Sequence, residues 1–280
     1  SQTVPIDVQE RQKDQVTFSF GRNWQSFVER HLTPERERLA LQSICDFVET
    51  SDLEGRSFLD VGCGSGVFSL AACRLRARNI YSFDVDPFSV RCCQELRRRA
   101  GDPEHWTVAE GSILDLEFLQ CLPKADVVYA WGSLHHTGNM WQAIRNAASL
   151  VAPGGLFFLS IYNQVDGRRG SEFWLRVKRR YNRSSSVVKR LMELAYAARF
   201  GVLPALRSFQ NPAQSLRNYG RERGMSFWPD VVDWLGGYPY EFATVHAIFR
   251  FCTRELGMEL VNVLDTNTTG TNQFLFRRRE

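Results

Sequence analysis

Three closely spaced glycines and an aspartate, placed after an apolar segment, are the residues of this chain most suited to hold a ligand. The segment 57–61 runs into Gly62-Cys63-Gly64-Ser65-Gly66, and an apolar helix is expected at 66–76. Glycines after a strand let a ligand approach the backbone closely, because no Cβ stands in the way. The first amides of the helix then point at the ligand. We therefore predict a binding loop formed by Asp60, Gly62, Cys63, Gly64 and Gly66.

The spacing of the loop and the position of Asp60 distinguish two kinds of cofactor. A dinucleotide-binding loop reads Gly-x-Gly-x-x-Gly, whereas this loop reads Gly-x-Gly-x-Gly. A carboxylate two residues before the first glycine would repel a pyrophosphate, but it suits the ammonium group of a methionine moiety. The charge favours S-adenosylmethionine, while NAD and an ordinary tight turn without a ligand stay as alternatives.

A second acidic position follows the next expected strand, at 80–83. Asp84 ends this strand, and an acidic side chain about 20 residues beyond a glycine loop can accept both ribose hydroxyls of a nucleoside. Asp86 precedes Pro87 and is expected to cap the helix 87–99. Asp84 is therefore the predicted ribose ligand.

The run from Asp60 to Gly66 resembles the first motif of class I S-adenosylmethionine-dependent methyltransferases. The segment 125–136 and Pro153-Gly154-Gly155 are similar to the ubiquinone-biosynthesis-type branch of small-molecule methyltransferases, and the resemblance covers about residues 57–163. It implies that Asp60 and the glycine backbone hold the methionine end. Family members often have Gly-Asp-Ala after the third strand, where this chain has Gly111-Ser112-Ile113. Ser112 and the amide of Ile113 are thus the adenine candidates, with Glu110 as a substitute.

Two further residues complete the predicted cofactor set, and two histidines are candidates for catalysis. Val85 and Trp131 are expected to contact the cofactor, since the resemblance implies that the strand 125–131 ends beside the sulfonium. His135 and His136 follow that strand, and one imidazole could deprotonate a hydroxyl near neutral pH. Histidines in such places also cap helices or line pockets. No residue spacing predicts a metal site.

Apolar segments alternate with helical patterns on both sides of these motifs. Strands are expected at 57–61, 80–83, 106–109, 125–131 and 155–162, and later at 258–264 and 272–277. Helices are expected at 34–49, 87–99, 140–151 and 243–256, and a basic helical segment at 172–199. This rhythm predicts an α/β fold, a Rossmann-like seven-stranded mostly parallel sheet with helices on both faces and an inserted helical cap. The predicted domains are an N-terminal helical and aromatic segment (1–55), the cofactor-binding core (56–163), the basic cap (164–240) and the end of the core (241–280).

Composition narrows the class of protein further. The chain has 280 residues, 44% of them hydrophobic, and a formal net charge of +4. Its seven cysteines include no Cys-x-x-Cys pair, which favours a reducing compartment over a disulfide framework. No apolar run reaches the length of about 20 residues that a bilayer requires. We therefore expect a cytoplasmic biosynthetic enzyme, and the sequence leaves its oligomeric state open.

The charge is concentrated in the expected cap. Residues 165–225 hold fourteen Lys or Arg against four Asp or Glu, an excess of ten positive charges. Such a surface suggests an anionic partner, for which a small anionic acceptor and RNA are both candidates, nucleic acid being the weaker one. A solvated helix face is the simpler interpretation.

Aromatic residues next to the cap suggest where a methyl acceptor binds. The stretch 224–241 is rich in aromatic residues, glycine and proline, and it precedes a core helix. Aromatic walls with a few polar groups suit a small organic acceptor, although a packed hinge is the alternative. The predicted acceptor residues are Trp24, Tyr162, Tyr238, Tyr240 and Glu241. The predicted reaction is O-methylation of a metabolite, the alternatives being N- or C-methylation, RNA methylation, and nucleoside binding without turnover.

Overall fold

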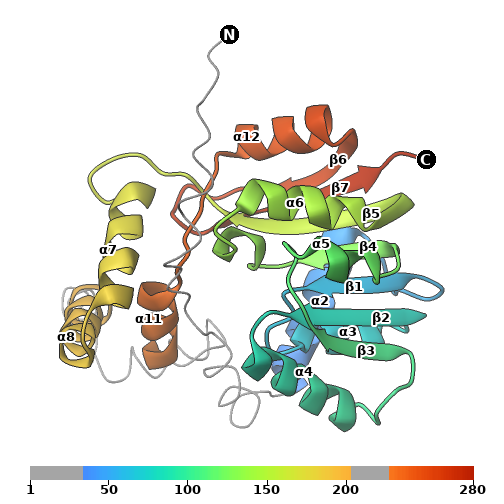
Figure 1. The fold of residues 1–280 in the computed structure, drawn as a ribbon, viewed down its shortest axis with the longest axis horizontal. Helices are drawn as coiled ribbons and strands as arrows, with labels where there is room; N and C mark the ends of the chain where they lie inside the picture. Colours follow the sequence, from blue (N-terminus) through green and yellow to red (C-terminus); the bar gives the residue numbers. More distant parts are fainter. Residues whose placement is uncertain (1–33, 203–226) are drawn as a thin grey trace.

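A seven-stranded sheet with helices on both faces forms the body of the computed structural model, which describes residues 34–202 and 227–280 (Figure 1). The strands are β1 (Ser57–Val61), β2 (Asn79–Asp84), β3 (Trp106–Glu110), β4 (Ala125–Ala130), β5 (Val151–Tyr162), β6 (Met258–Leu264) and β7 (Thr271–Arg278). The helices around the sheet are α2 (Pro34–Val48), α3 (Val67–Arg74), α4 (Pro87–Arg99), α5 (Leu116–Gln120), α6 (Met140–Ser149) and α12 (Val245–Arg250). This is the predicted fold class.

The strand order is β3-β2-β1-β4-β5-β7-β6, and β7 runs antiparallel to both of its neighbours. The chain builds outward from β1 to β3 and then returns to place β4 on the other side of β1. The carboxyl ends of β1 and β4 therefore flank a topological switch point, where parallel α/β sheets bind their ligands. Both the glycine loop and the histidine pair follow these two strands.

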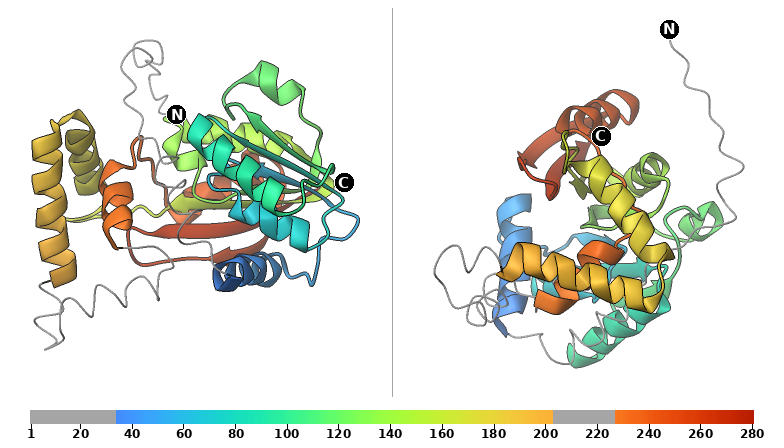
Figure 2. Two further views of the ribbon diagram at one scale, coloured as in Figure 1. Left: turned by 90° about the horizontal axis from the view of Figure 1, so that it is seen from below. Right: turned by 90° about the vertical axis from the view of Figure 1, so that its left-hand side faces the viewer.

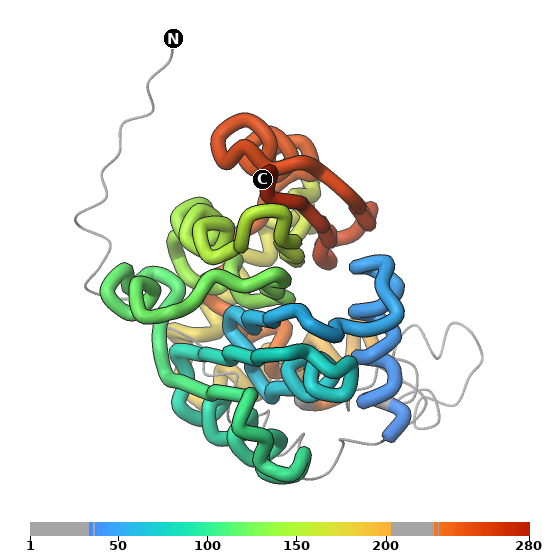
Figure 3. Tube along the Cα trace, turned by 90° about the vertical axis from the view of Figure 1, so that its right-hand side faces the viewer, coloured from blue at the N-terminus to red at the C-terminus, as the bar shows by residue number. Residues whose placement is uncertain are grey.

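Two apolar layers hold the helices against the sheet. Helices α2, α3 and α4 contribute Ile44, Leu70 and Leu96 to one core, and α6 and α12 contribute Ile144 and Ile248 to the core on the other face. Figure 3 shows α2 and α6 on opposite sides of the strands. Because both faces are covered, the central strands are buried along their whole length, as all five residues of β1 illustrate.

Among the described residues between β5 and α12, three helices gather beside the sheet (Figure 2). They are α7 (Ser171–Arg183), α8 (Ser186–Tyr196) and α11 (Phe227–Gly236), and a π-helical segment, Ala197–Val202, follows α8. Trp174, Tyr181, Val231, Leu235 and Tyr240 form an apolar cluster of their own between them. Since β5 leads directly into this group, the helices lie at the carboxyl edge of the sheet.

The structure corrects several predicted elements. The single helix expected over 172–199 is interrupted at Ser184–Ser185, because Ser184 adopts an extended conformation and ends α7. The aromatic stretch expected as an irregular segment contains α11, and the short helix α5 was not predicted. The helix expected at 243–256 divides into α12 and a π-helical turn, Phe251–Glu255, and β5 begins at Val151, four residues before the expected start.

Candidate cofactor and acceptor site

The glycine loop turns sharply between β1 and α3. Gly62, Gly64 and Gly66 all have positive φ angles, of 70°, 53° and 83°, which a side chain would disfavour. The amides of Gly62 and Cys63 both donate to the carbonyl of Phe83, at 2.9 and 3.0 Å. The loop is thereby tied to the end of β2, next to Asp84.

Close packing adds a second reason for glycine in the loop. A Cβ built on Gly62 would lie 2.4 Å from the Cβ of Ser133, and one on Gly66 would lie 2.7 Å from the sulfur of Cys93. Ser133 itself donates its hydroxyl to the carbonyl of Val61 at 2.6 Å. The segment after β4, which carries the histidine pair, is thus held directly against the glycine loop.

Asp84 lies at the carboxyl end of β2, as predicted. Its Oδ2 accepts the amide of Gly64 at 2.9 Å, and its Oδ1 accepts the amide of Asp86 at 2.9 Å. Burial raises the pKa of Asp84, and these amides oppose that rise. Two backbone donors therefore fix the carboxylate beside the glycine loop, and its remaining lone pairs suit two vicinal hydroxyls.

Asp60 is more deeply buried than the resemblance implies. Its Oδ2 accepts the hydroxyl of Ser69 at 2.5 Å, and Ser69 lies 2.7 Å from the hydroxyl of Ser82, which accepts the indole N–H of Trp106 at 2.9 Å. Burial raises the pKa of Asp60 to about 7. The carboxylate therefore joins α3 to β1 and β2, and the role at the methionine end that we predict for it stays a prediction.

The segment after β3 meets the end of β2. Glu110 pairs with Asp84 in the sheet, and the amide of Gly111 donates to the carbonyl of Asp84 at 3.0 Å. The hydroxyl of Ser112 accepts the amide of Leu114 at 3.1 Å, and Ile113 is buried. The residues predicted for adenine and for ribose are therefore neighbours.

Two large apolar side chains beside the loop face solvent. Val85 is 68% exposed and Trp131 is 43% exposed, and the ring of Trp131 lies 5.6 Å from that of Phe68, on α3. A nucleoside with an amino-acid tail would contact three features of this edge. They are the exposed apolar groups, the Asp84 carboxylate with its remaining lone pairs, and the turn whose glycines have no Cβ atoms. The residues present thus fit S-adenosylmethionine.

The histidine pair occupies the short helix Leu134–His136. His135 is 1% exposed, its Nδ1 has no partner among the described residues, and its ring lies 4.1 Å from the ring of Tyr162. The Nδ1 of His136 lies 2.6 Å from the carbonyl of Pro239, so this nitrogen carries the proton and donates it. Burial lowers the pKa of His136 to about 4 and that of His135 well below its usual value. Both rings are neutral at pH 7, and neutral imidazole can accept a proton.

The predicted acceptor residues meet the histidines from the side of the cap. Tyr162 ends β5, and its ring lies 4.8 Å from that of Tyr240 and 6.0 Å from that of Trp234. Tyr238 is half-buried and precedes Pro239, the partner of His136. The structure therefore brings the histidines and tyrosines into one cluster at the carboxyl ends of β4 and β5.

Glu241 and Trp24 differ from the other predicted acceptor residues. The Glu241 carboxylate accepts the amide of Met140, the first residue of α6, at 3.1 and 3.2 Å, and its own amide donates to the carbonyl of His135 at 3.0 Å. Burial raises the pKa of Glu241 to about 7. This residue anchors the histidine segment to α6, whereas Trp24 lies outside the described residues.

Lys178 is a member of this cluster that the sequence did not single out. It is 0% exposed, its Nζ donates to the carbonyl of Trp234, and the Nζ lies 4.0 Å from the ring centroid of Trp234 and 4.8 Å from that of Tyr240. Lys178 shares the buried face of α7 with Trp174 and Tyr181. Their spacing of four and three residues is the signal that could have placed this lysine inside.

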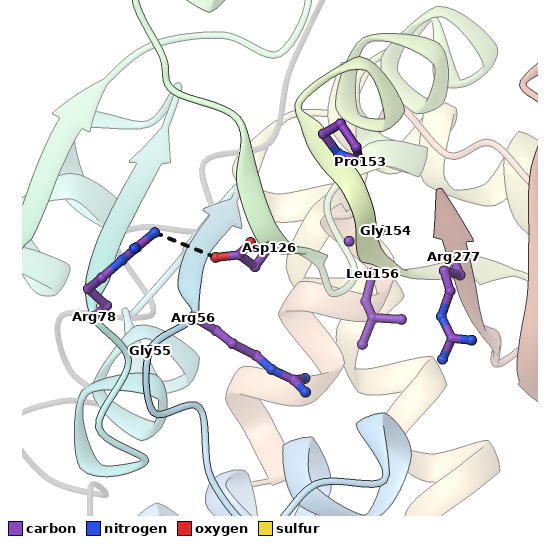
Figure 4. A pocket seen from close by; sticks show the side chains of 9 residues that line it. Gly55, Arg56, Arg78, Asp126, Pro153, Gly154, Leu156 and Arg277 are labelled. Carbon is purple, nitrogen blue, oxygen red and sulfur yellow. Dashed lines mark ion pairs between the residues drawn. The ribbon is translucent and has the colours of Figure 1, made fainter. Parts of the chain in front are cut away.

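A separate pocket of about 380 Å³ lies at the opposite edge of the sheet, where the parallel strands begin (Figure 4). Its lining includes Arg56, Arg277, Gly154 and an ion pair between Arg78 and Asp126 at 3.8 Å. None of the predicted site residues lines it. Over residues 34–202 and 227–280, no cluster of three or more His, Cys, Asp or Glu side chains could hold a metal ion, and no helix is long and apolar enough to cross a membrane.

Known relatives share parts of this chain. It is 33% identical over 129 residues to the ribosomal protein L11 methyltransferase of Photorhabdus laumondii, covering 44% of this chain and 40% of that one. It is 32% identical over 113 residues to the ubiquinone biosynthesis O-methyltransferase of Methylobacterium nodulans, covering 40% of this chain and 43% of that one. The matches thus span less than half the length of either relative.

Solved structures support the fold over most of the chain. An O-methyltransferase family protein from Burkholderia thailandensis has a TM-score of 0.55 at 14% identity. The match covers 92% of this chain and 60% of that one. The magnesium protoporphyrin IX methyltransferase of Synechocystis PCC 6803, with bound S-adenosylhomocysteine, has a TM-score of 0.51 at 16% identity. The match covers 90% of this chain and 87% of that one.

A sequence profile described as a methyltransferase domain matches residues 24–227, which is more than half of the chain. The glycine turn, the carboxylate at the end of β2 and the order of the strands agree with that match. The chain therefore belongs to the methyltransferase domain family, among the class I S-adenosylmethionine-dependent methyltransferases.

Proposed function

We propose that this protein methylates an oxygen atom of a small-molecule acceptor. The observation that carries the proposal is the position of the histidine pair, which follows β4 and is held against the glycine loop through Ser133 and Val61. Aromatic rings of β5 and of the cap cover the same place. A neutral base between the cofactor loop and an aromatic wall suits an acceptor hydroxyl.

S-adenosylmethionine supplies, when bound, a methyl group activated by a positive sulfonium. Asp84 and the backbone of the glycine loop hold its nucleoside and methionine ends, with Val85 and Trp131 against its apolar parts. Tyr162 and Tyr240 orient the acceptor and exclude water, so that the acceptor oxygen is aligned for an in-line displacement. The protein has little further chemistry to do beyond removing the hydroxyl proton.

His136 is the residue placed to take that proton. Because its Nδ1 donates to the carbonyl of Pro239, the lone pair of the imidazole is on Nε2. The hydroxyl proton of the acceptor would move to Nε2 as its oxygen bonds to the methyl carbon, while the bond from that carbon to the sulfonium breaks and S-adenosylhomocysteine leaves. Burial lowers the pKa of His136 to about 4, so the ring is neutral at pH 7 and its Nε2 can accept the proton.

An RNA acceptor is a second candidate because of the outer face of α7. Arg176, Arg179, Arg180 and Arg183 are all exposed there. RNA binding would weaken steeply with salt, whereas binding of a small hydroxylated acceptor would depend on salt only weakly. The relative that acts on ribosomal protein L11 makes a protein acceptor a further test case.

The first experiment measures binding of S-adenosylhomocysteine by calorimetry and then methyl transfer to a panel of small alcohols, phenols and amines. We expect binding, and transfer to hydroxyl acceptors in preference to amines. His136→Gln should lower kcat by about 100-fold or more, the contribution typical of a general base. His246→Gln is the matched control, since His246 is exposed on α12. Equal rates for the two variants would show that His136 is not a general base. Methyl transfer to amines alone would overturn the proposal of O-methylation.

A further inference from the structure

The buried lysine of α7 stands apart from the other basic residues of the cap. Its neighbours on the helix, Arg176, Arg179 and Arg180, are exposed, whereas Lys178 is completely buried. A lysine is almost never fully buried unless it is paired. Within the part of the chain that the structure describes, no carboxylate forms an ion pair with Lys178, and its Nζ donates only to the carbonyl of Trp234. The ammonium group has three protons, so two of them lack an acceptor.

Two neighbouring donors lack partners as well. The indole N–H of Trp234 and the hydroxyl of Tyr240 are buried without a hydrogen-bond partner among the described residues. The Ser171 hydroxyl beside Tyr240 already donates to the carbonyl of Asn163 at 3.0 Å and accepts the amide of Val165 at 2.9 Å. Both rings are in contact with the Lys178 ammonium. Buried polar groups are normally hydrogen-bonded, and here those left over are mainly donors.

The charges around Lys178 do not neutralise it. Asp233, on α11, is the carboxylate that acts on it, while His135 and His136 approach from the sheet and are neutral at pH 7. Tyr162 and Tyr240 are also neutral, because burial raises the pKa values of both phenols. Burial outweighs Asp233 and lowers the pKa of Lys178 to about 7.

We propose that Lys178, with the Trp234 indole and the Tyr240 hydroxyl, binds a carboxylate on the methyl acceptor. This inference rests on the proposed function and narrows its acceptor to a hydroxylated organic acid. A carboxylate offers about four lone-pair sites to these donors, whose remaining protons have no acceptor among the described residues. It also supplies a counter-charge to the buried Lys178 ammonium. The chain of rings from Tyr240 through Tyr162 to His136 then joins the anchored end of the acceptor to the place where its hydroxyl reacts.

Calorimetry with benzoate and benzamide tests the inference, because the two probes share a shape and differ in charge. Wild type should bind benzoate roughly 10- to 100-fold more tightly than benzamide, as expected for hydrogen bonds to a charged group. Lys178→Met should abolish that preference. The exposed neighbour supplies the control, since Arg179→Met should preserve it.

Proton uptake separates recognition by Lys178 from a structural role. At pH 8 a lysine with a pKa of about 7 is mostly neutral, so binding of an anion should take up close to one proton. The apparent enthalpy of benzoate binding should then change with the ionisation enthalpy of the buffer in wild type and in Arg179→Met, but not in Lys178→Met. Tyr240→Phe, which removes a donor without removing the charge, should weaken benzoate and leave the proton uptake unchanged.

Binding of S-adenosylhomocysteine keeps the two hypotheses apart. We expect it to be equal in wild type and Lys178→Met, which also verifies that the variant is folded. If wild type binds S-adenosylhomocysteine but does not prefer benzoate, or if Lys178→Met keeps the preference, the lysine inference is wrong and the methyltransferase proposal stands. If wild type does not bind S-adenosylhomocysteine, the proposed function itself fails.

Discussion

The cofactor loop differs in its buried hydrogen bonds from the junction between cap and sheet, which is the cluster of His135, Tyr162, Lys178, Trp234 and Tyr240. At the loop, Asp60 and Asp84 accept hydrogen bonds from Ser69, Gly64 and Asp86 at 2.5 to 2.9 Å. At the junction, polar atoms of His135, Trp234 and Tyr240 have no partner among the described residues. Both regions lie at the carboxyl edge of the same sheet. The buried carboxylates of the loop thus have hydrogen-bond partners without a ligand, whereas several buried polar atoms of the junction have none among the described residues.

A preorganised loop suits a cofactor that every member binds, because its geometry need not adapt. Unpartnered donors lower stability, and they are retained where a ligand uses them. We infer that the acceptor binds at the junction, where buried polar groups lack hydrogen-bond partners among the described residues.

The largest effect should come from a side chain placed in the loop. Gly62→Ala forces a Cβ to within 2.4 Å of Ser133 at a φ angle of 70°. We expect S-adenosylhomocysteine binding to be lost and the protein to be destabilised by about 1–3 kcal/mol. Gly132→Ala is the control, since Gly132 has a φ angle of 71° with nothing within 4 Å. Calorimetry and thermal unfolding that show equal losses would mean that backbone strain, not the contact with Ser133, is responsible.

Removing the charge at the end of β2 should have the next largest effect. Asp84→Asn should weaken S-adenosylhomocysteine about 100-fold, if each of two hydrogen bonds to a charged group contributes about 1.5 kcal/mol. Asp126→Asn, in which the carboxylate accepts the amide and hydroxyl of Ser57 at the other edge of the sheet, should leave binding unchanged. Comparable losses in both variants would show that stability, and not ribose contact, is being measured.

At the junction, an apolar substitution should stabilise the protein. Lys178→Met removes a buried cation, and gains of about 1–4 kcal/mol are typical of such changes. Because burial lowers the folded-state pKa of Lys178 from 10.5 to about 7, the unfolded chain holds more protons between these values. Wild-type stability should therefore rise with pH across this window relative to Lys178→Met. Chemical denaturation at pH 6 and pH 10 measures it, and a gap between the two proteins that does not shrink with pH would contradict the assignment.

The smallest effects provide the most direct contrast. Ser69→Ala takes a donor from the buried Asp60 and should destabilise the protein by about 1–3 kcal/mol. Tyr240→Phe removes a hydroxyl that has no partner within the described residues, so stability should stay equal or rise slightly. If Tyr240→Phe were as destabilising as Ser69→Ala in urea unfolding, the junction would be as well satisfied as the loop.

The succession of strands and helices and the glycine turn could be predicted because their signals are local. The alternation of strands and helices indicated a parallel sheet, and Asp84 follows the glycine loop by one βα unit. The helix break at Ser184 and the helix α11 had no such signal, because packing against Trp174 and Tyr240 stabilises aromatic segments there. The sequence placed the histidines directly after β4, where the structure has them, whereas the contact of Glu241 with the amide of Met140 had no signal in the sequence. The roles predicted for these residues stay predictions.

The sequence by itself determined the family and the fold class, and it placed the glycine turn and Asp84 at the ends of neighbouring strands, since these residues lie within one or two βα units. The tertiary structure alone decided which distant groups meet. Ser133 reaches Val61 across 72 residues because β4 is inserted beside β1, and Lys178 reaches Trp234 across 56 residues because α11 packs on α7. The burial of Lys178 and the partners of Asp60 follow from these contacts, and so do their altered pKa values. Spacing along the chain can place Lys178 on the same helix face as Trp174 and Tyr181, but how deeply that face is buried depends on the elements that pack over it.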